Sequence, residues 1–165
     1  MEGPISSILS NVSYLDLSNN RFSEIASFFC APKVKMLKFL YLSSNYVLEE
    51  LPNCWRHLVN LELLDLSDNV FFGKIPTNIG SLFQMETLKL RNNTLVGELP
   101  SSMMNYTSLA VTDLADNKLS SSVPEWLGDS LPNLVILMLQ SNQFSGNLPS
   151  QLCHLTRTNF GFLYD

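Results

Sequence analysis

Two pairs of aspartates are the residues in this sequence best suited to acid–base or metal chemistry. Asp65 and Asp68 stand three residues apart, and so do Asp113 and Asp116. Paired carboxylates can pass a proton or bind Ca²⁺. Each pair flanks a short segment with strand periodicity, on the side expected to face solvent, and neither has a nucleophile or a cluster of metal ligands beside it. We therefore predict solvated surface carboxylates, no enzyme activity, no metal site and no cofactor.

The histidines, the cysteines and the overall charge point to no other chemistry. His57 and His154 have no Cys or Ser partner in phase with the sequence pattern, which favours solvated or packed side chains. The three cysteines do not match a zinc-binding spacing. The net charge of −5 and the pI of about 4.9 argue against a nucleic-acid partner.

The elements that position these residues repeat along the chain. In the clearest copy, Leu64 and Leu66 alternate with their neighbours, so both leucines lie on one face of a strand. Asn69 ends the strand, where its amide can satisfy backbone groups as the chain turns away. Gly73 then permits a tight turn, and Pro76 fixes φ. Since so short a strand cannot bury a core alone, it needs copies of itself.

Copies of this stretch recur every 24 or 25 residues. Leucines three and five residues before the closing asparagine keep the same phase in nearly every copy, and a fixed period of this kind indicates a solenoid. We predict that the asparagines form a buried structural ladder: Asn20, Asn45, Asn69, Asn93, Asn117 and Asn142. We also predict six strands of one parallel sheet, centred near Asp16, Tyr41, Asp65, Lys89, Asp113 and Met138.

The unit L-x-x-L-x-L-x-x-N-x-F-x-G-x-I-P resembles the leucine-rich repeat of the plant extracellular type. The resemblance covers roughly Met1–Leu155 and implies an α/β repeat solenoid. This is a right-handed superhelix with a parallel sheet on the concave face, and mostly loops and short 3-10 turns on the convex face. Glu24, Glu49 and Ser121 replace the turn glycine in three copies, and Ser27 replaces the first proline, so we expect these turns to be built differently.

A single leucine-rich repeat domain is predicted for residues 1–165. We divide it into a partial first coil over residues 1–11, six repeats over about residues 12–155 and an incomplete last coil over residues 156–165. The sequence shows no signal peptide, and no apolar run approaches the ~20 residues of a membrane span. We interpret the chain as a truncated segment of an ectodomain that is extracellular, at the plasma-membrane surface, in its full-length context.

Cys30 and Cys54 occupy the same column of adjacent coils, ten residues before Leu40 and Leu64 respectively. Neighbouring strands lie ~4.7–4.9 Å apart, a spacing that fits the ~4.4–6.8 Å Cα separation of disulfides. A disulfide between coils is therefore sterically allowed, and two buried thiols are the alternative. Cys153 has no partner in phase and is expected to be a packed thiol.

Three N-glycosylation sequons begin at Asn11, Asn92 and Asn105. Asn105 falls on the segment that returns from the strand, a position where the resembled family often carries glycans. A glycan on Asn92 would instead crowd the open face of the sheet. All three are candidate sites if the chain is secreted.

The outward positions between the inward leucines form the predicted recognition surface. Aromatic and apolar side chains gather there over the first three coils, and such anchors are enriched at protein interfaces. We predict that a protein or peptide ligand binds Tyr14, Asp16, Phe39, Tyr41, Tyr46, Leu63, Asp65, Lys89 and Arg91. A truncated loop or a glycan covering the patch is the alternative, and the sixth coil offers a competing site through Ile136, Met138 and Gln140.

Three functions are compatible with the sequence. The first is a non-catalytic recognition segment of a plant receptor-like protein, acting in defence or developmental signalling with a partner kinase or a co-receptor kinase. The second is a secreted inhibitor of a cell-wall-degrading enzyme, of the polygalacturonase-inhibiting type. The third is a truncated remnant without binding activity. A signal peptide and a membrane span in the full gene would favour the first, and complete caps without a span would favour the second.

Overall fold

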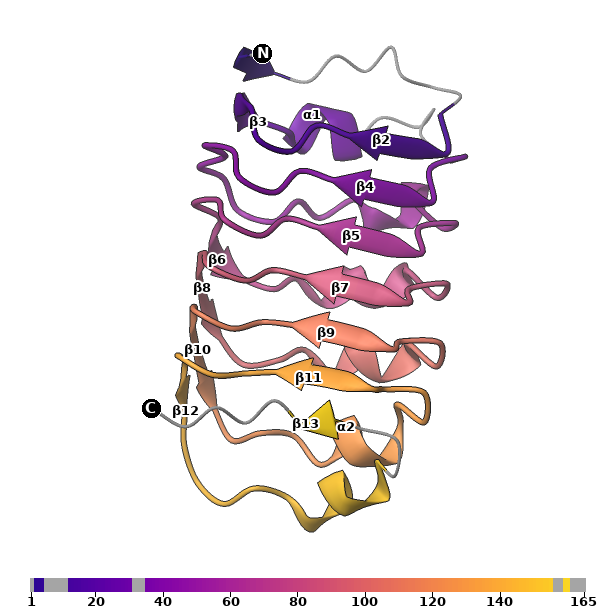
Figure 1. Ribbon diagram of the computed structural model, residues 1–165, viewed down its shortest axis with the longest axis vertical. Coiled ribbons are helices and arrows are strands. Elements are labelled where there is room, and N and C mark those ends of the chain that lie inside the picture. Colours follow the sequence, from indigo (N-terminus) through magenta and orange to yellow (C-terminus); the bar gives the residue numbers. More distant parts are fainter. Residues whose placement is uncertain (1, 5–11, 31–34, 156–158, 161–165) are drawn as a thin grey trace.

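The computed structural model of the protein describes residues 2–4, 12–30, 35–155 and 159–160. Successive coils are stacked along the long axis of the molecule, with the strands of one sheet facing the viewer in Figure 1. This arrangement confirms the predicted α/β solenoid. Each coil contributes one short strand to the sheet and then returns along the back of the molecule.

The main sheet is parallel and has seven strands in the order β13-β11-β9-β7-β5-β4-β2. The strands are β2 (Tyr14–Asp16), β4 (Phe39–Tyr41), β5 (Leu63–Asp65), β7 (Thr87–Lys89), β9 (Val111–Asp113), β11 (Ile136–Met138) and β13 (Asn159–Phe160). Six of them end at the residues predicted as their centres. The seventh, β13, pairs with β11 although the leucine pattern fails after Leu155, so the expected incomplete last coil does contribute a strand.

The ladder asparagines join each coil to the one before it. Asn69 shows the pattern: its amide nitrogen donates to Leu66 O and Ser67 O of its own coil and to Leu42 O of the preceding coil, at 3.2, 3.1 and 2.9 Å. Its Oδ1 accepts a hydrogen bond from Val47 N at 3.2 Å. Asn45, Asn93, Asn117 and Asn142 repeat these contacts in their own coils. Asn20 donates to Leu17 O and Ser18 O of its own coil, and Asn20 and Asn142 are half-buried, which corrects the prediction for the two ends of the ladder.

The residue before each ladder asparagine has a left-handed backbone conformation. The φ values lie between 51° and 57° for Asn19, Ser44, Asp68, Asn92, Asp116 and Ser141. Four of these six residues are Asn or Asp, the non-glycine types that tolerate this region best. Each coil thus turns away from the sheet at the same place, and the asparagine that follows is directed into the molecule.

A second parallel sheet runs along the flank of the solenoid, at the left of Figure 1, and was not predicted. Its strands are β6 (Phe72–Lys74), β8 (Thr94–Gly97), β10 (Lys118–Ser121) and β12 (Gln143–Phe144). In the first coils, β1 (Glu2–Pro4) pairs separately with β3 (Arg21–Glu24). Gly73, Gly97 and Gly146 follow this path with φ between 75° and 85°, and Ser121 adopts the same conformation at 85°.

The back of the molecule consists of loops and short helices, as expected. The 3-10 helices are η1 (Trp55–His57), η2 (Thr77–Ser81), η3 (Ser101–Asn105) and η4 (Ser150–His154), and the α-helices are α1 (Ala26–Phe29) and α2 (Trp126–Asp129). None of the helices in the described ranges has the length and hydropathy needed to cross a membrane. Pro76, Pro100 and Pro149 stand just before η2, η3 and η4, whereas α1 has no such proline.

In the first coil, where that proline is missing, a side chain of the next coil contacts the start of α1 instead. Glu49 Oε2 accepts hydrogen bonds from Ile25 N at 3.0 Å and Ala26 N at 3.1 Å, at the start of α1. A carboxylate at this end of a helix satisfies free N–H groups. Glu24 and Glu49 are not among the described residues with positive φ, so these two turns are built differently, as expected. The same expectation is wrong for Ser121, which keeps the conformation of the turn glycines.

The core continues from coil to coil between the sheet and the back. Its largest fully buried side chains include Trp55, Tyr106, Phe28 and Phe29, and the rings of Phe29 and Trp55 are 4.7 Å apart. The structure has a disulfide between Cys30 and Cys54, with a Cα separation of 5.2 Å. Cys153, in contrast, is exposed, so the prediction that it is a packed thiol is wrong.

Two further features of the core follow from single residues. Thr112 stands in a leucine column with 1% of its surface exposed, and its hydroxyl has no hydrogen-bond partner in the described structure. Tyr106 also replaces a leucine, but its hydroxyl donates to Ile79 O in the preceding coil at 2.5 Å. Burial raises the pKa of the Tyr106 phenol. The phenol therefore acts as a neutral donor between coils.

Candidate ligand-recognition surface

The solvent side of the main sheet, which we call the concave face, carries the predicted recognition residues in register. In one row, Tyr14, Phe39 and Leu63 lie side by side on β2, β4 and β5. In the next row, Asp16, Tyr41, Asp65, Lys89 and Asp113 follow one another across five strands. The period of the repeat places these side chains on one face because neighbouring coils pair without a shift.

Tyr14, Phe39 and Tyr41 make contact and form what we call the aromatic cluster. The ring centroids of Tyr14 and Phe39 are 6.3 Å apart, and those of Tyr14 and Tyr41 are 5.5 Å apart, with interplanar angles of 46° and 45°. Tyr14 is 57% exposed, while Phe39 and Tyr41 are half-buried. Leu63 continues the row of Phe39 and is also half-buried.

The sequence predicts that Tyr46 belongs to this cluster, but the structure places it on the flank of the solenoid. The chain has already turned at Ser44, and Tyr46 N donates to Phe22 O on the flank of the solenoid. Its side chain is 65% exposed, and no ring contact among the described aromatic residues joins it to Tyr41. The sequence pattern shows that Tyr46 points outward, but it does not show that the turn directs it to a different surface.

Asp65 is buried, which corrects the prediction of a solvated carboxylate. Only 8% of its surface is exposed, because it lies between Tyr41 and Lys89 of the neighbouring strands. Its Oδ1 accepts a hydrogen bond from Ser67 N at 3.1 Å, and its Oδ2 is 3.8 Å from Lys89 Nζ. Asp65 is therefore already paired with a cation inside the protein.

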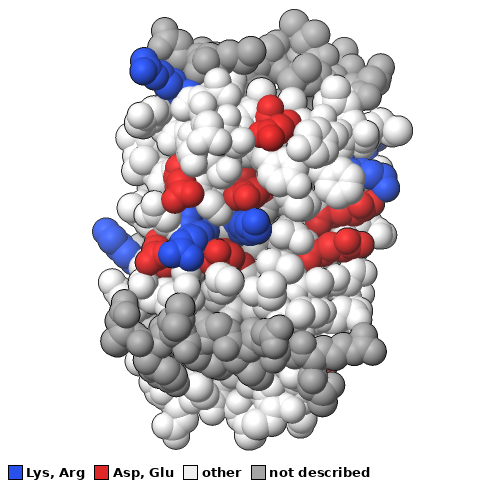
Figure 2. Space-filling model, in the orientation of Figure 1, with Lys and Arg blue, Asp and Glu red and all other residues white. Residues whose placement is uncertain are grey.

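Asp113 lies on the other side of Lys89 and is half-buried. Burial raises the pKa of the Asp113 carboxyl, and the hydrogen bond from Ala115 N together with the charges of Arg91 and Lys89 only partly offsets this effect. Arg91 itself binds Asp116 at 2.8 Å. Figure 2 shows these acidic and basic side chains interleaved over the middle strands. Lys89 and Arg91 therefore belong to a surface network of ion pairs.

Asp16 differs from the other acids of its row because it is exposed. Its Oδ1 accepts two hydrogen bonds from Ser18, one from the hydroxyl at 2.6 Å and one from the backbone N–H at 2.9 Å. These two bonds lower the pKa of Asp16. Within the described residues, no cation forms a salt bridge with this carboxylate.

The predicted glycosylation sites differ in their surroundings. Asn105 is exposed at the end of η3, on the back of the molecule. Asn92 is exposed beside the main sheet, but its amide donates to Asp68 Oδ1 at 2.8 Å, and Thr94 of the same sequon donates to Phe71 O. Asn11 lies outside the described residues. The structure favours Asn105 as the more accessible acceptor.

The competing site on the sixth coil is half-buried. Ile136, Met138 and Gln140 are all of intermediate exposure, and β13 pairs alongside β11 at Ile136.

His154, predicted to be isolated, has its Nδ1 3.0 Å from Asp129 Oδ1 on the exposed back of the molecule. No group of three potential metal ligands exists among the described residues.

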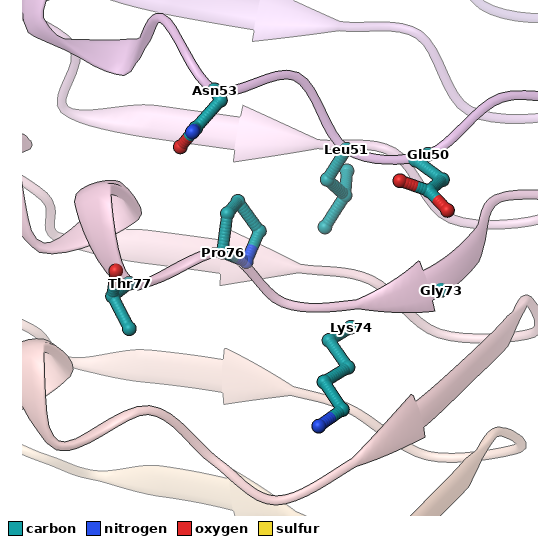
Figure 3. Close-up of a pocket in the computed structure, with 7 residues that line it drawn as sticks. All are labelled: Glu50, Leu51, Asn53, Gly73, Lys74, Pro76 and Thr77. Carbon is teal, nitrogen blue, oxygen red and sulfur yellow. The ribbon is translucent and has the colours of Figure 1, made fainter.

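A groove with a volume of about 530 Å³ lies between two coils, where the flank passes into the back of the molecule. Glu50, Leu51 and Asn53 line it from one coil, and Gly73, Lys74, Pro76 and Thr77 line it from the next (Figure 3). Glu50 and Lys74 occupy equivalent positions of their repeats. The groove contains no nucleophile beside a base, so it offers no catalytic arrangement.

The comparisons with known proteins agree with the geometry. Two family models described as leucine-rich repeat match residues 10–71 and 133–155. No curated protein sequence matches the chain. Among similar solved structures, the plant peptide hormone receptor RGFR1 in complex with RGF2 is 25% identical, with a TM-score of 0.87 over 95% of this chain and 25% of that chain. PEPR1 with AtPEP1 is 29% identical, with a TM-score of 0.81 over 96% and 26%.

A third similar structure is the Arabidopsis receptor kinase HAESA in complex with the peptide hormone IDA and the co-receptor SERK1. It is 29% identical, with a TM-score of 0.72 over 97% of this chain and 32% of that chain. The chain thus spans between a quarter and a third of the length of these receptor chains. From its repeat columns, its asparagine ladder and these matches, the chain belongs to the leucine-rich repeat family, and its fold is that of plant receptor ectodomains.

Proposed function

We propose that the chain is a non-catalytic recognition segment of a plant cell-surface receptor. It binds a protein or peptide ligand on the concave face and contributes to defence or developmental signalling with a partner kinase. The observation that carries this proposal is the aromatic cluster, whose rings stay partly exposed although Leu40 and Leu42 on the same coil are fully buried. Exposed aromatic side chains of this kind are common anchors at protein interfaces.

The location of these rings supports recognition of an extended ligand. The strands of the sheet are in register, so side chains of successive coils form rows along the solenoid. A peptide that crosses the strands runs along such a row and meets the side chains of one coil after another. The similar structures include a plant peptide hormone receptor in complex with RGF2 and the receptor kinase HAESA in complex with the peptide hormone IDA. The middle strands offer paired charges, and the first strands offer aromatic surface.

An extracellular setting, in which Asn105 carries a glycan, is part of the same proposal. The disulfide between Cys30 and Cys54 supports it, because such bonds persist in oxidising compartments. Expression through a plant secretory pathway, followed by glycosidase treatment, should lower the apparent mass of the wild-type chain. The shift should disappear in Asn105→Gln if this is the main site, and a wild-type mass that glycosidase leaves unchanged would contradict this part of the proposal.

Ligand binding is tested with a displayed library of random peptides selected on the purified chain. Selected peptides should lose about 30-fold in affinity for Tyr41→Ala, which corresponds to the ~2 kcal/mol of a hot-spot residue. The melting temperature of this variant should change little, because Tyr41 lies outside the core. Phe83→Ala is the control, since Phe83 is an exposed aromatic residue that follows η2 and does not belong to the aromatic cluster. Equal losses for both variants, or no selected peptide, would refute the proposal.

A further inference from the structure

We propose that the group anchored on the aromatic cluster is a guanidinium, supplied by an arginine side chain of the ligand. The arginine lies over the ring of Tyr41 and pairs with the carboxylate of Asp16. This inference rests on the proposed function and specifies the chemistry of the ligand at that same site.

The first support is the position of Tyr41 between two carboxylates. Asp16, Tyr41 and Asp65 are direct neighbours in register on β2, β4 and β5. Adjacent strands are ~4.8 Å apart, so both carboxylates lie beside the Tyr41 side chain. The Tyr14 ring borders the same space from the next row, with its centroid 5.5 Å from that of Tyr41. A group placed here meets aromatic surface and negative charge together.

The second support is the difference in charge compensation between the two acids. Asp65 already has Lys89 Nζ at 3.8 Å, and Asp116, farther along the sheet, has Arg91 at 2.8 Å. Asp16 has only the two hydrogen bonds from Ser18, both to Oδ1, which leaves Oδ2 free in the described structure. Because those bonds also lower the pKa of Asp16, the carboxylate stays ionised in mildly acidic as well as neutral solution. Asp16 therefore carries a negative charge without a salt-bridge partner in the described structure, and it lies next to the aromatic cluster.

The third support is the match to the physical properties of arginine. The faces of aromatic rings attract cations, and a planar guanidinium can stack on a ring while its edge donates hydrogen bonds to a carboxylate. An apolar ligand group would contact the rings but desolvate Asp16 without a partner. An acidic group would be repelled by Asp16. A lysine ammonium is more strongly hydrated and lacks the flat surface, so it fits less well on a half-exposed ring.

The test starts from the peptides selected on the wild-type chain. Arginine should be enriched at one position of the selected sequences, and replacing it by glutamine should lower the affinity about tenfold or more, as measured by calorimetry. Replacement by lysine should cost less than replacement by glutamine. Between pH 7 and pH 5 the affinity of the parent peptide should stay constant, because Asp16 remains ionised over this range.

A double-mutant cycle assigns the effect to Asp16. Asp16→Asn should lower the affinity of the arginine peptide by a similar factor, and the glutamine peptide should then bind wild type and Asp16→Asn within about twofold of each other. Glu98→Gln is the matched control, because Glu98 is an exposed acid on the flank and should leave all affinities unchanged. Melting temperatures verify that both variants are folded.

The outcomes separate this inference from the proposed function. Selected peptides that depend on Tyr41 but show no enriched arginine, or no coupling to Asp16, would overturn the guanidinium anchor and leave ligand binding intact. A failure to select any peptide that depends on Tyr41 would overturn both. Enriched arginine with full coupling to Asp16 would establish the anchor.

Discussion

Replacing Asn69 by alanine tests the asparagine ladder, and the expected loss can be derived contact by contact. The side chain makes four hydrogen bonds, three as donor and one as acceptor. Each of the three carbonyl oxygens that accept from Asn69 also accepts a hydrogen bond from a second donor. Leu42 O also accepts from Asn45, Leu66 O from Asn93, and Ser67 O from the backbone N–H of Ser44.

The backbone N–H that donates to Asn69 Oδ1, in contrast, has no second acceptor among the described residues. Val47 N donates only to Asn69 Oδ1 at 3.2 Å, and the bond is buried. In Asn69→Ala this N–H loses its partner, at a cost of about 1–3 kcal/mol, while the shared carbonyls limit the remaining damage. For a chain of this length, such a loss lowers the melting temperature by about 3–9 °C.

The assay is urea denaturation followed by circular dichroism, with thermal melting as a second measurement. Asn133→Ala is the matched control, because Asn133 makes one exposed hydrogen bond to Thr107 O in the preceding coil. This variant should lose no more than about 0.5–1.5 kcal/mol, the net value of a single hydrogen bond. If Asn69→Ala is as stable as wild type, or no less stable than the control, then the buried N–H of Val47 does not depend on the ladder and the reasoning is wrong.

Four other predictions concern single sites. Ser121→Gly should stabilise the protein by about 1 kcal/mol in urea denaturation, because serine at a φ of 85° is strained and glycine is not. Thr112→Val should also stabilise it by about 1 kcal/mol, because it removes a buried hydroxyl without a partner, and a lower midpoint would contradict this. Loss of the disulfide in the double variant Cys30→Ser, Cys54→Ser should cost about 3 kcal/mol, whereas replacing the exposed third cysteine should have no effect. Asp113→Asn should raise the melting temperature at pH 7. The raised pKa means that ionisation of Asp113 disfavours the folded state, so the gain should vanish at about pH 3, where the carboxyl is protonated in both states.

The leucine columns predicted the strands well because burial and period determine them together. Leu40, Leu64 and Leu88 are fully buried, and the strands that contain them lie where the pattern placed them. The strands end, rather than centre, at the predicted residues. Single backbone bonds between coils continue beyond them, as from Leu66 N to Lys89 O and from Asp68 N to Arg91 O, until the left-handed residue turns the coil away. The flank sheet was missed because its strands, such as Thr94–Gly97, follow a turn in the repeat and have too few residues to show a period of their own.

The burial of Asp65 shows a limit of pattern reasoning on the concave face. Alternation along β5 correctly predicts that Asp65 points away from the core, but exposure also depends on the neighbours across the strands. Tyr41 and Lys89 are long side chains, and they cover the shorter aspartate between them. Asp16 has the same place in its own repeat and is exposed. Asp16 is on the end strand β2, which pairs on one side only, whereas Asp65 has paired strands on both sides. The exposure of an acid in this column therefore depends on the strands beside it and on the residues that they carry.

The aromatic cluster stands on two coils that are joined by contacts outside the repeat pattern. Coil one departs from the repeat, since it lacks the turn glycine and the proline, and Glu49 of coil two caps its helix instead. The disulfide from Cys30 and the ring contact between Phe29 and Trp55 join the same two coils on the back of the molecule. These contacts join the coils that contain β2 and β4, the strands that carry Tyr14, Phe39 and Tyr41. A surface held in this way loses little conformational freedom when a ligand binds, so the irregular first repeat gives the recognition surface a rigid base.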